Sequence, residues 1–188
     1  MKIDVFYLCQ KDFLFKYLKP LTDKKSFALA FYELVEDTYF NKKIIYNIMP
    51  LLKDVGVLCV GCELKNIGEV ISLCEQNSYD YNVFFFHSNF DTSKILTFDR
   101  NVLIYVLLYG ERSCDNGIRL VKMGTDIKND AVRFLTNLSS VNDIILLIGN
   151  SCKHITYFKN MCRNLVCFSN NEGMLKFAEN EALTIQEV

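Results

Sequence analysis

Residues 143–153 read DIILLIGNSCK, a short apolar run that ends in a single glycine and a polar turn. The apolar run, residues 143–148, is typical of a buried strand, and Gly149 begins the turn that follows it. We expect a helix over residues 152–162, directly after this turn. A strand joined by a tight turn to a helix is the repeating unit of α/β proteins, so this segment predicts an α/β fold.

The same alternation extends over the rest of the chain. Short apolar runs predict strands over residues 2–9, 55–63, 81–87, 102–109, 165–168 and 183–188. Periodic apolar positions predict helices over residues 41–52, 67–76, 128–138 and 172–180. A further helix is expected over residues 24–39, where the apolar stripe consists of Phe27, Phe31, Leu34 and Val35. Residues 113–124 are polar and predict a loop.

One connection between two predicted strands differs from the others. Residues 88–101, which join the strands at 81–87 and 102–109, show no helical stripe. A connection without a crossover helix favours antiparallel neighbours, whereas the nearly all-apolar strands elsewhere favour a parallel sheet covered on both faces. The sequence therefore predicts a single domain, residues 1–188, with helices on both faces of a mostly parallel sheet of roughly seven strands and one antiparallel strand.

Composition restricts the class of protein. A hydrophobic content of 51% over 188 residues predicts a packed core, and a net charge of -1 excludes the overall basic excess of a stand-alone nucleic-acid binder. Charged Lys2, Asp4, Lys11 and Asp12 interrupt the N-terminal apolar run, so we expect no signal peptide, and no apolar run is long enough to span a membrane. The eight cysteines are therefore expected to be reduced thiols in a cytoplasmic or nuclear protein.

The sequence offers few metal-ligating or catalytic side chains. Cys59 and Cys62 form a CxxC, but no second ligand pair accompanies them, and residues three apart on a strand point to opposite faces. His87 and His154 are the only histidines, and nothing in the sequence ties either to a nucleophile. We expect no metal site, with the two cysteines in the core and the two histidines in structural roles.

The turn at residues 149–153 resembles a ligand-binding turn only in part. Such turns are rich in glycine, so that the backbone can approach a nucleotide, whereas this turn has Gly149 alone. A ribose-binding strand ends in an acid, whereas the predicted strand at 165–168 is followed by Ser169 and Asn170. A single glycine also suits an ordinary tight turn, so both interpretations stand at this point.

Residues 130–182 nevertheless carry a family resemblance. This segment is similar to the C-terminal part of the amino-methylating (N6-adenine and N4-cytosine) DNA methyltransferases. The similarity lies in the order of Phe134, Leu135, Leu138, Ser139, Ser140 and Asp143, followed by the stretches ILLIGNSCK and LVCFSNNEGMLKFA. The similar class is the permuted one, whose cofactor motifs come last. The resemblance implies a Rossmann-type methyltransferase fold. The family reads Val-Leu-Asp-Pro-Phe-x-Gly-Ser-Gly at its first motif, so the vestigial cofactor positions are Leu147, Gly149, Ser151 and Ser169.

The N-terminus resembles the same class. The family's catalytic motif, Asp-Pro-Pro-Tyr, follows its opening strand, and the corresponding positions here are Cys9, Gln10, Lys11 and Asp12, followed by Phe13. In the family, this motif accepts hydrogen bonds from the target amine and stacks on the flipped base. Gln10 could accept such a bond and Phe13 could stack, but both prolines are missing. The resemblance therefore implies a degenerate catalytic motif.

Together these patterns predict a catalytically inactive methyltransferase-like domain without a cofactor, which acts as a binding or structural subunit, for instance of a nucleic-acid methyltransferase complex. The expected partner is another protein or a second copy, contacted through the aromatic-rich stretch with Phe13, Phe15, Tyr17 and Leu18. Nucleic acid is expected only through such a complex, and no membrane contact is expected. Two alternatives remain open: an active S-adenosylmethionine-dependent methyltransferase with a divergent site built from Gly149, Ser169, Gln10 and Phe13, and an unrelated α/β interaction domain.

Overall fold

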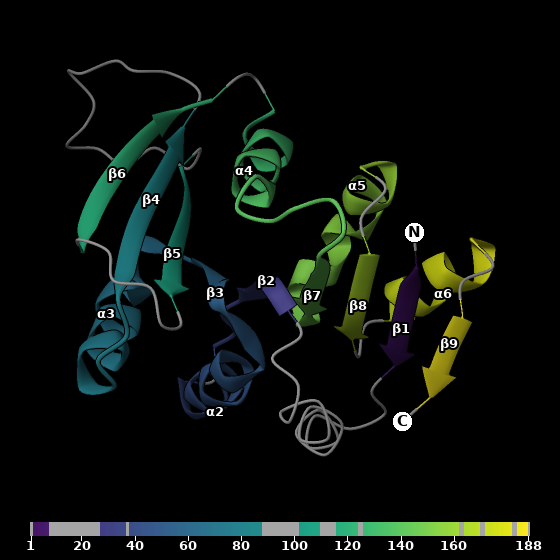
Figure 1. The fold of residues 1–188 in the computed structure, drawn as a ribbon, viewed down its shortest axis with the longest axis horizontal. Coiled ribbons are helices and arrows are strands. Elements are labelled where there is room, and N and C mark those ends of the chain that lie inside the picture. Colours follow the sequence, from purple (N-terminus) through teal and green to yellow (C-terminus); the bar gives the residue numbers. More distant parts are fainter. Residues whose placement is uncertain are drawn as a thin grey trace.

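The computed structural model describes residues 2–7, 27–36, 38–87, 102–109, 116–123, 126–161, 164–169, 172–181 and 184–187. Within these ranges the chain forms one nine-stranded sheet in the order β6-β4-β5-β3-β2-β7-β8-β1-β9 (Figure 1). The strands are β1 (Ile3–Tyr7), β2 (Phe27–Glu33), β3 (Leu52–Cys62), β4 (Tyr81–His87), β5 (Leu103–Tyr109), β6 (Gly117–Lys122), β7 (Ile144–Ile148), β8 (Asn164–Ser169) and β9 (Thr184–Glu187).

A single strand of this sheet runs against all the others. β5 is antiparallel to both of its neighbours, β3 and β4, while every other pairing between described strands is parallel. This confirms the antiparallel strand that was predicted from the missing crossover helix before residue 102. The sheet has more strands than the roughly seven expected, because β6 and β9 extend its two edges.

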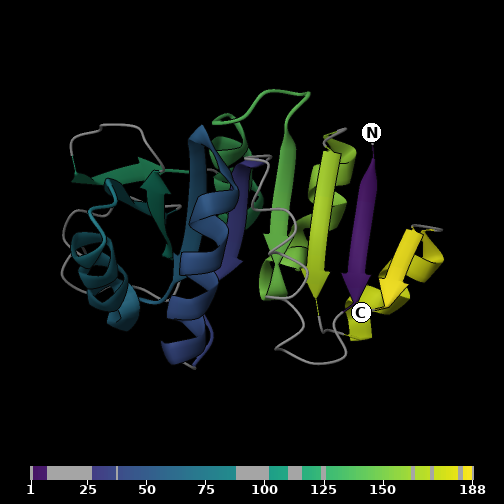
Figure 2. The same ribbon diagram turned by 60° about the horizontal axis from the view of Figure 1, so that its bottom comes forward.

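Helices cover both faces of the sheet, as predicted (Figures 1 and 2). The helical segments are α2 (Thr38–Ile48), η2 (Met49–Leu51), η3 (Leu64–Asn66), α3 (Ile67–Gln76), α4 (Ile127–Thr136), η5 (Gly149–His154), α5 (Ile155–Asn160) and α6 (Glu172–Asn180). α2 and α3 bury Ile44, Ile48 and Leu73 against one face. α4, α5 and α6 bury Leu135, Phe158 and Ala178 against the other face. The domain is therefore a three-layer sandwich with two separate cores.

The helix predicted over residues 24–39 is wrong. Residues 27–33 form β2, a central strand between β3 and β7, and α2 begins only at Thr38. The first six residues of β2, FALAFY, are all buried, because both faces of a central strand are covered. A fully apolar run of this length fits a buried strand as well as a helical stripe, and its position in the middle of the sheet decides between the two.

Two smaller predictions also fail. The loop expected over residues 113–124 contains β6, an edge strand whose half-solvated position tolerates polar side chains. The helix expected over residues 152–162 is divided into the 3-10 segment η5 and the short helix α5, because the chain turns directly out of β7 at Gly149. The helix expected over residues 41–52 ends at Ile48, and Pro50 lies in η2 directly after it, since proline lacks the N–H that would continue the helix.

β3 contains a close backbone approach that only glycine permits. Gly56 is buried where the pairing of β2 with β3 shifts register, between Phe27 and Leu29. A β-carbon on Gly56 would lie 2.9 Å from the carbonyl oxygens of Lys53 and Phe27 and from the β-carbon of Leu52. The missing side chain therefore lets the two strands continue side by side past the irregularity.

The described cysteines are free thiols. Cys59, Cys74, Cys152 and Cys167 are buried and Cys62 is half-buried. Burial raises the pKa of Cys62 and Cys74 to about 12 and that of Cys59 further still. No three His, Cys, Asp or Glu side chains in the described ranges are arranged to hold a metal ion. None of the described helices is long and apolar enough to cross a bilayer.

Candidate functional site

A cleft of about 390 Å³ lies at the carboxyl ends of β2, β7 and β8. This edge of a parallel sheet is where α/β folds bind ligands, because the turns into the helices converge there. The cleft is lined by Glu33 from β2, by Ser169 from β8, by Gly173 and Phe177 from α6, and by Gly149, Asn150, Cys152, Lys153, Ile155 and Thr156 from η5 and α5. The chain therefore retains a ligand-sized cleft beside the glycine turn.

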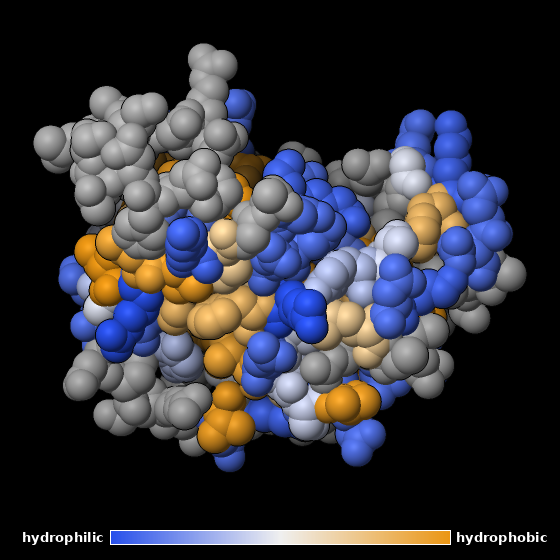
Figure 3. Space-filling model, turned by 90° about the horizontal axis from the view of Figure 1, so that it is seen from above, coloured by the Kyte–Doolittle hydropathy of each residue, from blue (hydrophilic) through white to orange (hydrophobic). Residues whose placement is uncertain are grey.

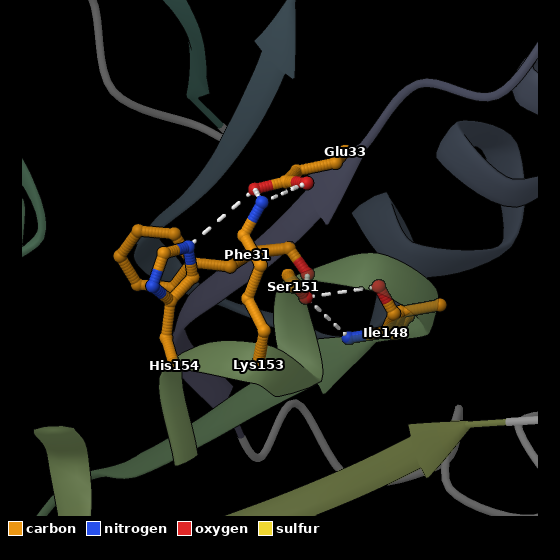
Figure 4. A network of polar contacts seen from close by, with 6 residues as sticks. All are labelled: Phe31, Glu33, Ile148, Ser151, Lys153 and His154. Atoms are coloured by element: carbon orange, nitrogen blue, oxygen red, sulfur yellow. Dashed lines mark hydrogen bonds and ion pairs between the residues drawn. The ribbon is translucent and has the colours of Figure 1, made fainter. Parts of the chain in front are cut away.

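The turn out of β7 is held in place by one serine. Gly149 has a φ of 61°, a conformation that glycine adopts without strain, and the space around its α-carbon is open. Two residues later, the Ser151 hydroxyl accepts a hydrogen bond from the Ile148 N–H at 2.8 Å and faces the carbonyls of Phe31 at 2.7 Å and Ile148 at 2.9 Å (Figure 4). Ser151 thus fixes the turn to β2 and is buried below the cleft rather than lining it.

An acid and two bases meet at the rim of the cleft. The Lys153 ammonium lies 2.6 Å from both carboxylate oxygens of Glu33. The imidazole of His154 is buried, and its Nε2 atom lies 3.4 Å from the same carboxylate (Figure 4). Among the residues that line the cleft, Glu33 is the only carboxylate, so its pairing with Lys153 leaves no free acid there within the described chain.

The pKa of Glu33 is lowered despite its burial. Burial of the carboxyl raises the pKa, because it removes water from the charged form, but the nearby imidazole of His154 and the ammonium of Lys153 outweigh this and lower it. The carboxylate is therefore ionised over the whole neutral range. Its partner Lys153 is half exposed, with 52% of its side chain accessible, so the ion pair is partly screened by water.

This ion pair should make the stability of the domain depend on pH. Because the pKa of Glu33 is lower in the folded than in the unfolded chain, its contribution is fully present above the unfolded value near 4.5 and is lost as the pH falls through the folded value. We expect Glu33→Gln to lower the free energy of unfolding by about 1 kcal/mol at pH 7. Urea unfolding of both proteins between pH 7 and pH 3 should show this difference shrinking as the pH falls.

Glu63→Gln is the matched control for this measurement. Glu63 is 75% exposed and pairs with Lys65 on the surface, so its loss should leave the pH profile of stability unchanged. A difference between wild type and Glu33→Gln that stays constant down to pH 3 would contradict the lowered pKa of Glu33.

The structure brings together some of the residues that the sequence singled out. Gly149 and Ser169 line the cleft, whereas Leu147 and Ser151 are buried behind it. The predicted catalytic positions Cys9, Gln10, Lys11, Asp12 and Phe13, and the neighbouring Phe15, Tyr17 and Leu18, lie outside the described residues. His87 ends β4, away from the cleft, while His154 lies beside it.

Sequence reasoning missed Glu33 and the role of Lys153. Glu33 lies inside the helix that the sequence predicts over residues 24–39. An acid near the end of a helical apolar stripe does not indicate a functional site. Read as the last residue of a buried strand, the same glutamate would have been a candidate site residue, since functional groups collect at the carboxyl ends of parallel strands. The sequence pattern places Lys153 in the turn after residue 148 but does not indicate that it pairs with Glu33.

The donor set of the cleft differs from that of a typical cofactor site. β8 ends in Ser169, whose hydroxyl carries no charge, and no carboxylate from β8 lines the cleft. A ribose diol is usually held by a charged acceptor at the end of this strand. The residues present therefore fit the diol and the positive charge of S-adenosylmethionine poorly, although the volume and the turn at Gly149 leave room for a ligand.

Comparison with known proteins gives evidence through structure alone. No known protein family and no curated protein matches the sequence. The crystal structure of M1.HpyAVI complexed with SAM matches with a TM-score of 0.66 and 12% identity over 96% of this chain and 99% of that one. TTHA0409 of Thermus thermophilus, named as a putative DNA modification methylase and complexed with S-adenosyl-L-methionine, matches with a TM-score of 0.63 and 10% identity over 100% and 97% of the two chains.

A third solved structure belongs to the same group. PvuII DNA methyltransferase, which is cytosine-N4-specific, matches with a TM-score of 0.53 and 9% identity over 89% of this chain and 82% of that one. The first two matches extend over 96% and 100% of this chain. At these identities the likeness concerns the fold. The chain therefore has the Rossmann-like fold of the DNA amino-methyltransferases.

Proposed function

We propose that this chain is a methyltransferase-like domain that does not transfer methyl groups and acts as a binding or structural subunit. The observation that carries the proposal is the ion pair between Glu33 and Lys153. The only carboxylate that lines the described cleft already has both oxygens on an ammonium of the same chain, 2.6 Å away. A group that must accept a hydrogen bond from a substrate amine would first have to give up this charged partner.

The end of β8 supports the same proposal. Ser169 replaces the acid that would hold a ribose diol, and loss of a charged hydrogen-bond acceptor costs about 1.5–3 kcal/mol of binding free energy. Such a loss weakens a micromolar ligand by roughly one to two orders of magnitude. The cleft at Gly149 then belongs to the scaffold, because the Ser151 hydrogen bonds fix the turn that forms it to β2 and the two cores pack around the strands.

The role as a subunit rests on the fold and on the sequence. A domain that keeps the fold of an enzyme without its charged groups can still stabilise or position an active copy, and this part of the argument is an analogy at the level of the fold. The partner is another protein or a second copy of the chain, and nucleic acid is reached through that complex.

One observation favours the alternative of an active enzyme with a divergent site. Glu33 is an acid at the carboxyl end of the strand next to the glycine turn, and an ionised carboxylate there could accept a hydrogen bond from an amine if Lys153 moved away. In that case Gly149 and Ser169 would hold S-adenosylmethionine. The two functions differ in whether the cofactor binds at all.

Calorimetry with S-adenosylmethionine tests the proposal. We expect the wild type to bind with a dissociation constant of about 10 to 100 μM or weaker, because the charged acceptor at the end of β8 is missing. Ser169→Asp restores that acceptor and should bind at least about tenfold more tightly than wild type. Ser169→Asn is the matched control of the same size without the charge and should bind no better than wild type. A dissociation constant of the wild type in the low micromolar range would contradict the proposal and favour the active alternative.

A further inference from the structure

At the edge of the sheet away from the cleft, β6 is the outermost of the described strands. β6 is the first strand in the sheet order and pairs with β4 on one side, and no described strand lies on its other side (Figure 1). An edge strand presents a row of unpaired main-chain N–H and carbonyl groups, which is a template for a further strand. β6 contains no proline that would block such pairing.

The hydrogen-bond pattern shows which residues of β6 face the open side. The Met123 N–H donates to the His87 carbonyl at 2.8 Å, directly after Lys122 pairs with His87 in the ladder. Main-chain groups alternate between the two sides of a strand, so the amides of Ile118, Leu120 and Lys122 point away from β4. A further strand would hydrogen-bond to these three residues.

The same part of β6 exposes apolar side chains beside the core. Ile118 and Leu120 are 68% and 56% exposed. In the ladder they pair with Val83 and Phe85, which are buried in the core under α3. Paired residues of neighbouring strands point to the same face, so Ile118 and Leu120 extend this core beyond the cover of α3. An additional strand with apolar side chains on this face would complete it.

Apolar surface also gathers on the opposite face of this end of the sheet. Seen from the side of α4 and α5, hydrophobic residues gather on the described surface toward the end that carries β4 and β6, whereas the end with α5 and α6 is mostly hydrophilic (Figure 3). Phe134 and Leu138, at the end of α4 and just beyond it, are 38% and 37% exposed. On this face the exposed Arg119 pairs with Phe84 in the ladder, so the edge carries a cation beside the apolar surface.

The charge of the edge identifies the partner. Arg119 and Lys122 are exposed cations, and neither forms an ion pair with another described residue. If β6 paired with the β6 of a second copy, the two cations of each strand would share one short ladder and repel each other. A strand with carboxylates on the face of Arg119 has the opposite preference.

We propose that the open edge of β6 binds an extended segment of a partner protein in which apolar and acidic side chains alternate. The segment adds a strand to the sheet, with its main chain on Ile118, Leu120 and Lys122. Its apolar side chains lie on the face of Ile118 and Leu120, and its carboxylates lie on the opposite face, near Arg119. This goes beyond the proposed function, because it holds whether or not the cleft binds S-adenosylmethionine. Its test leaves the cleft untouched, so either proposal can fail alone.

Two labelled octapeptides test the site, one of alternating valine and glutamate and one of alternating valine and lysine. Fluorescence anisotropy with the full chain should show the glutamate peptide binding with a dissociation constant below about 1 mM and the lysine peptide at least about tenfold more weakly. Absence of binding by the glutamate peptide below about 1 mM, or equal binding of the two, would overturn the proposal.

Two variants of β6 make the test specific. Leu120→Pro removes an amide that points to the open side, so it should spare the pairing with β4 and the melting temperature while weakening the glutamate peptide at least about tenfold. Arg119→Glu keeps the strand and should reverse the preference between the two peptides. Lys176→Glu, on α6, is the control with the same change of net charge and should leave both affinities unchanged.

The remaining outcomes would each assign the edge to another occupant and so overturn the proposal. Single-stranded oligothymidine could displace the glutamate peptide from the wild type and fail to bind Arg119→Glu. This result would show that the edge is a nucleic-acid surface. Self-association in sedimentation that Leu120→Pro abolishes would show that β6 pairs with a second copy. Binding of the glutamate peptide that both Leu120→Pro and Arg119→Glu leave unchanged would place the peptide elsewhere on the molecule.

Discussion

Replacing Gly56 by alanine should lower the free energy of unfolding by about 3 kcal/mol or more. The new methyl group would lie 2.9 Å from each of two carbonyl oxygens and from the β-carbon of Leu52. Two of these three atoms belong to the backbone of β2 and β3, so the clash is relieved only if the strands separate. Urea unfolding followed by circular dichroism would measure the loss.

Gly68→Ala is the matched control, because it makes the same chemical change in a different setting. A β-carbon on Gly68 meets no atom within 4 Å, and the residue lies in the first turn of α3. Alanine forms helix more readily than glycine, so this variant should be more stable than wild type by about 0.5 kcal/mol. Equal effects of the two substitutions would show that Gly56 is not at a close approach of strands.

Phe31→Ala should lower the free energy of unfolding as much as Gly56→Ala, because it creates a cavity where Gly56→Ala creates a steric clash. Phe31 is completely buried in the centre of β2, and its ring lies 5.3 Å from that of Phe158 and 6.2 Å from that of Tyr105, measured between centroids. Truncation leaves a cavity that α5 and β5 cannot close together, and such substitutions cost about 3–5 kcal/mol. Thermal and urea unfolding would both report the loss.

The control for Phe31 is an aromatic residue outside the core. Tyr39 is 76% exposed on α2, so Tyr39→Ala should change the free energy of unfolding by less than about 0.5 kcal/mol. A tolerated Phe31→Ala, with the unfolding midpoint close to that of Tyr39→Ala, would contradict the central position of β2 in the sheet.

Most of the sheet could be predicted because its strands are short, apolar and bounded by polar turns. The predicted spans at residues 67–76, 81–87 and 172–180 coincide with α3, β4 and α6. The direction of β5 followed from the composition of a loop. These features depend on local pattern, which the sequence displays directly.

β2 could not be predicted in the same way. Alanine, leucine and phenylalanine in FALAFYE suit a helix as well as a strand, and what makes them a strand is the presence of β3 and β7 on either side. Those neighbours lie about 25 and 115 residues further along the chain, a separation at which periodicity carries no information. The error concealed Glu33, because its meaning depends on standing at the end of a strand.

The residues of the candidate site also differ in whether a local sequence pattern predicts them. Gly149 and Ser169 were found because they stand at fixed positions after recognisable strands. The pairing of Glu33 with Lys153 joins residues 120 positions apart, and the order of the two strands that carry them is visible only in the folded sheet. The ion pair between Glu33 and Lys153 could therefore be identified only from the structure.

The position of β1 also has a consequence for how the chain folds. Its partners are β8 and β9, and Ile3 pairs with Leu165 across 162 residues. During synthesis β1 is made before the other described strands, whereas the two strands that flank it are the last of them, so both of its edges stay unpaired while the strands between are translated. Closing so long a loop makes this step slow, and it leaves the unpaired edges of β1 open to aggregation until β8 has been made.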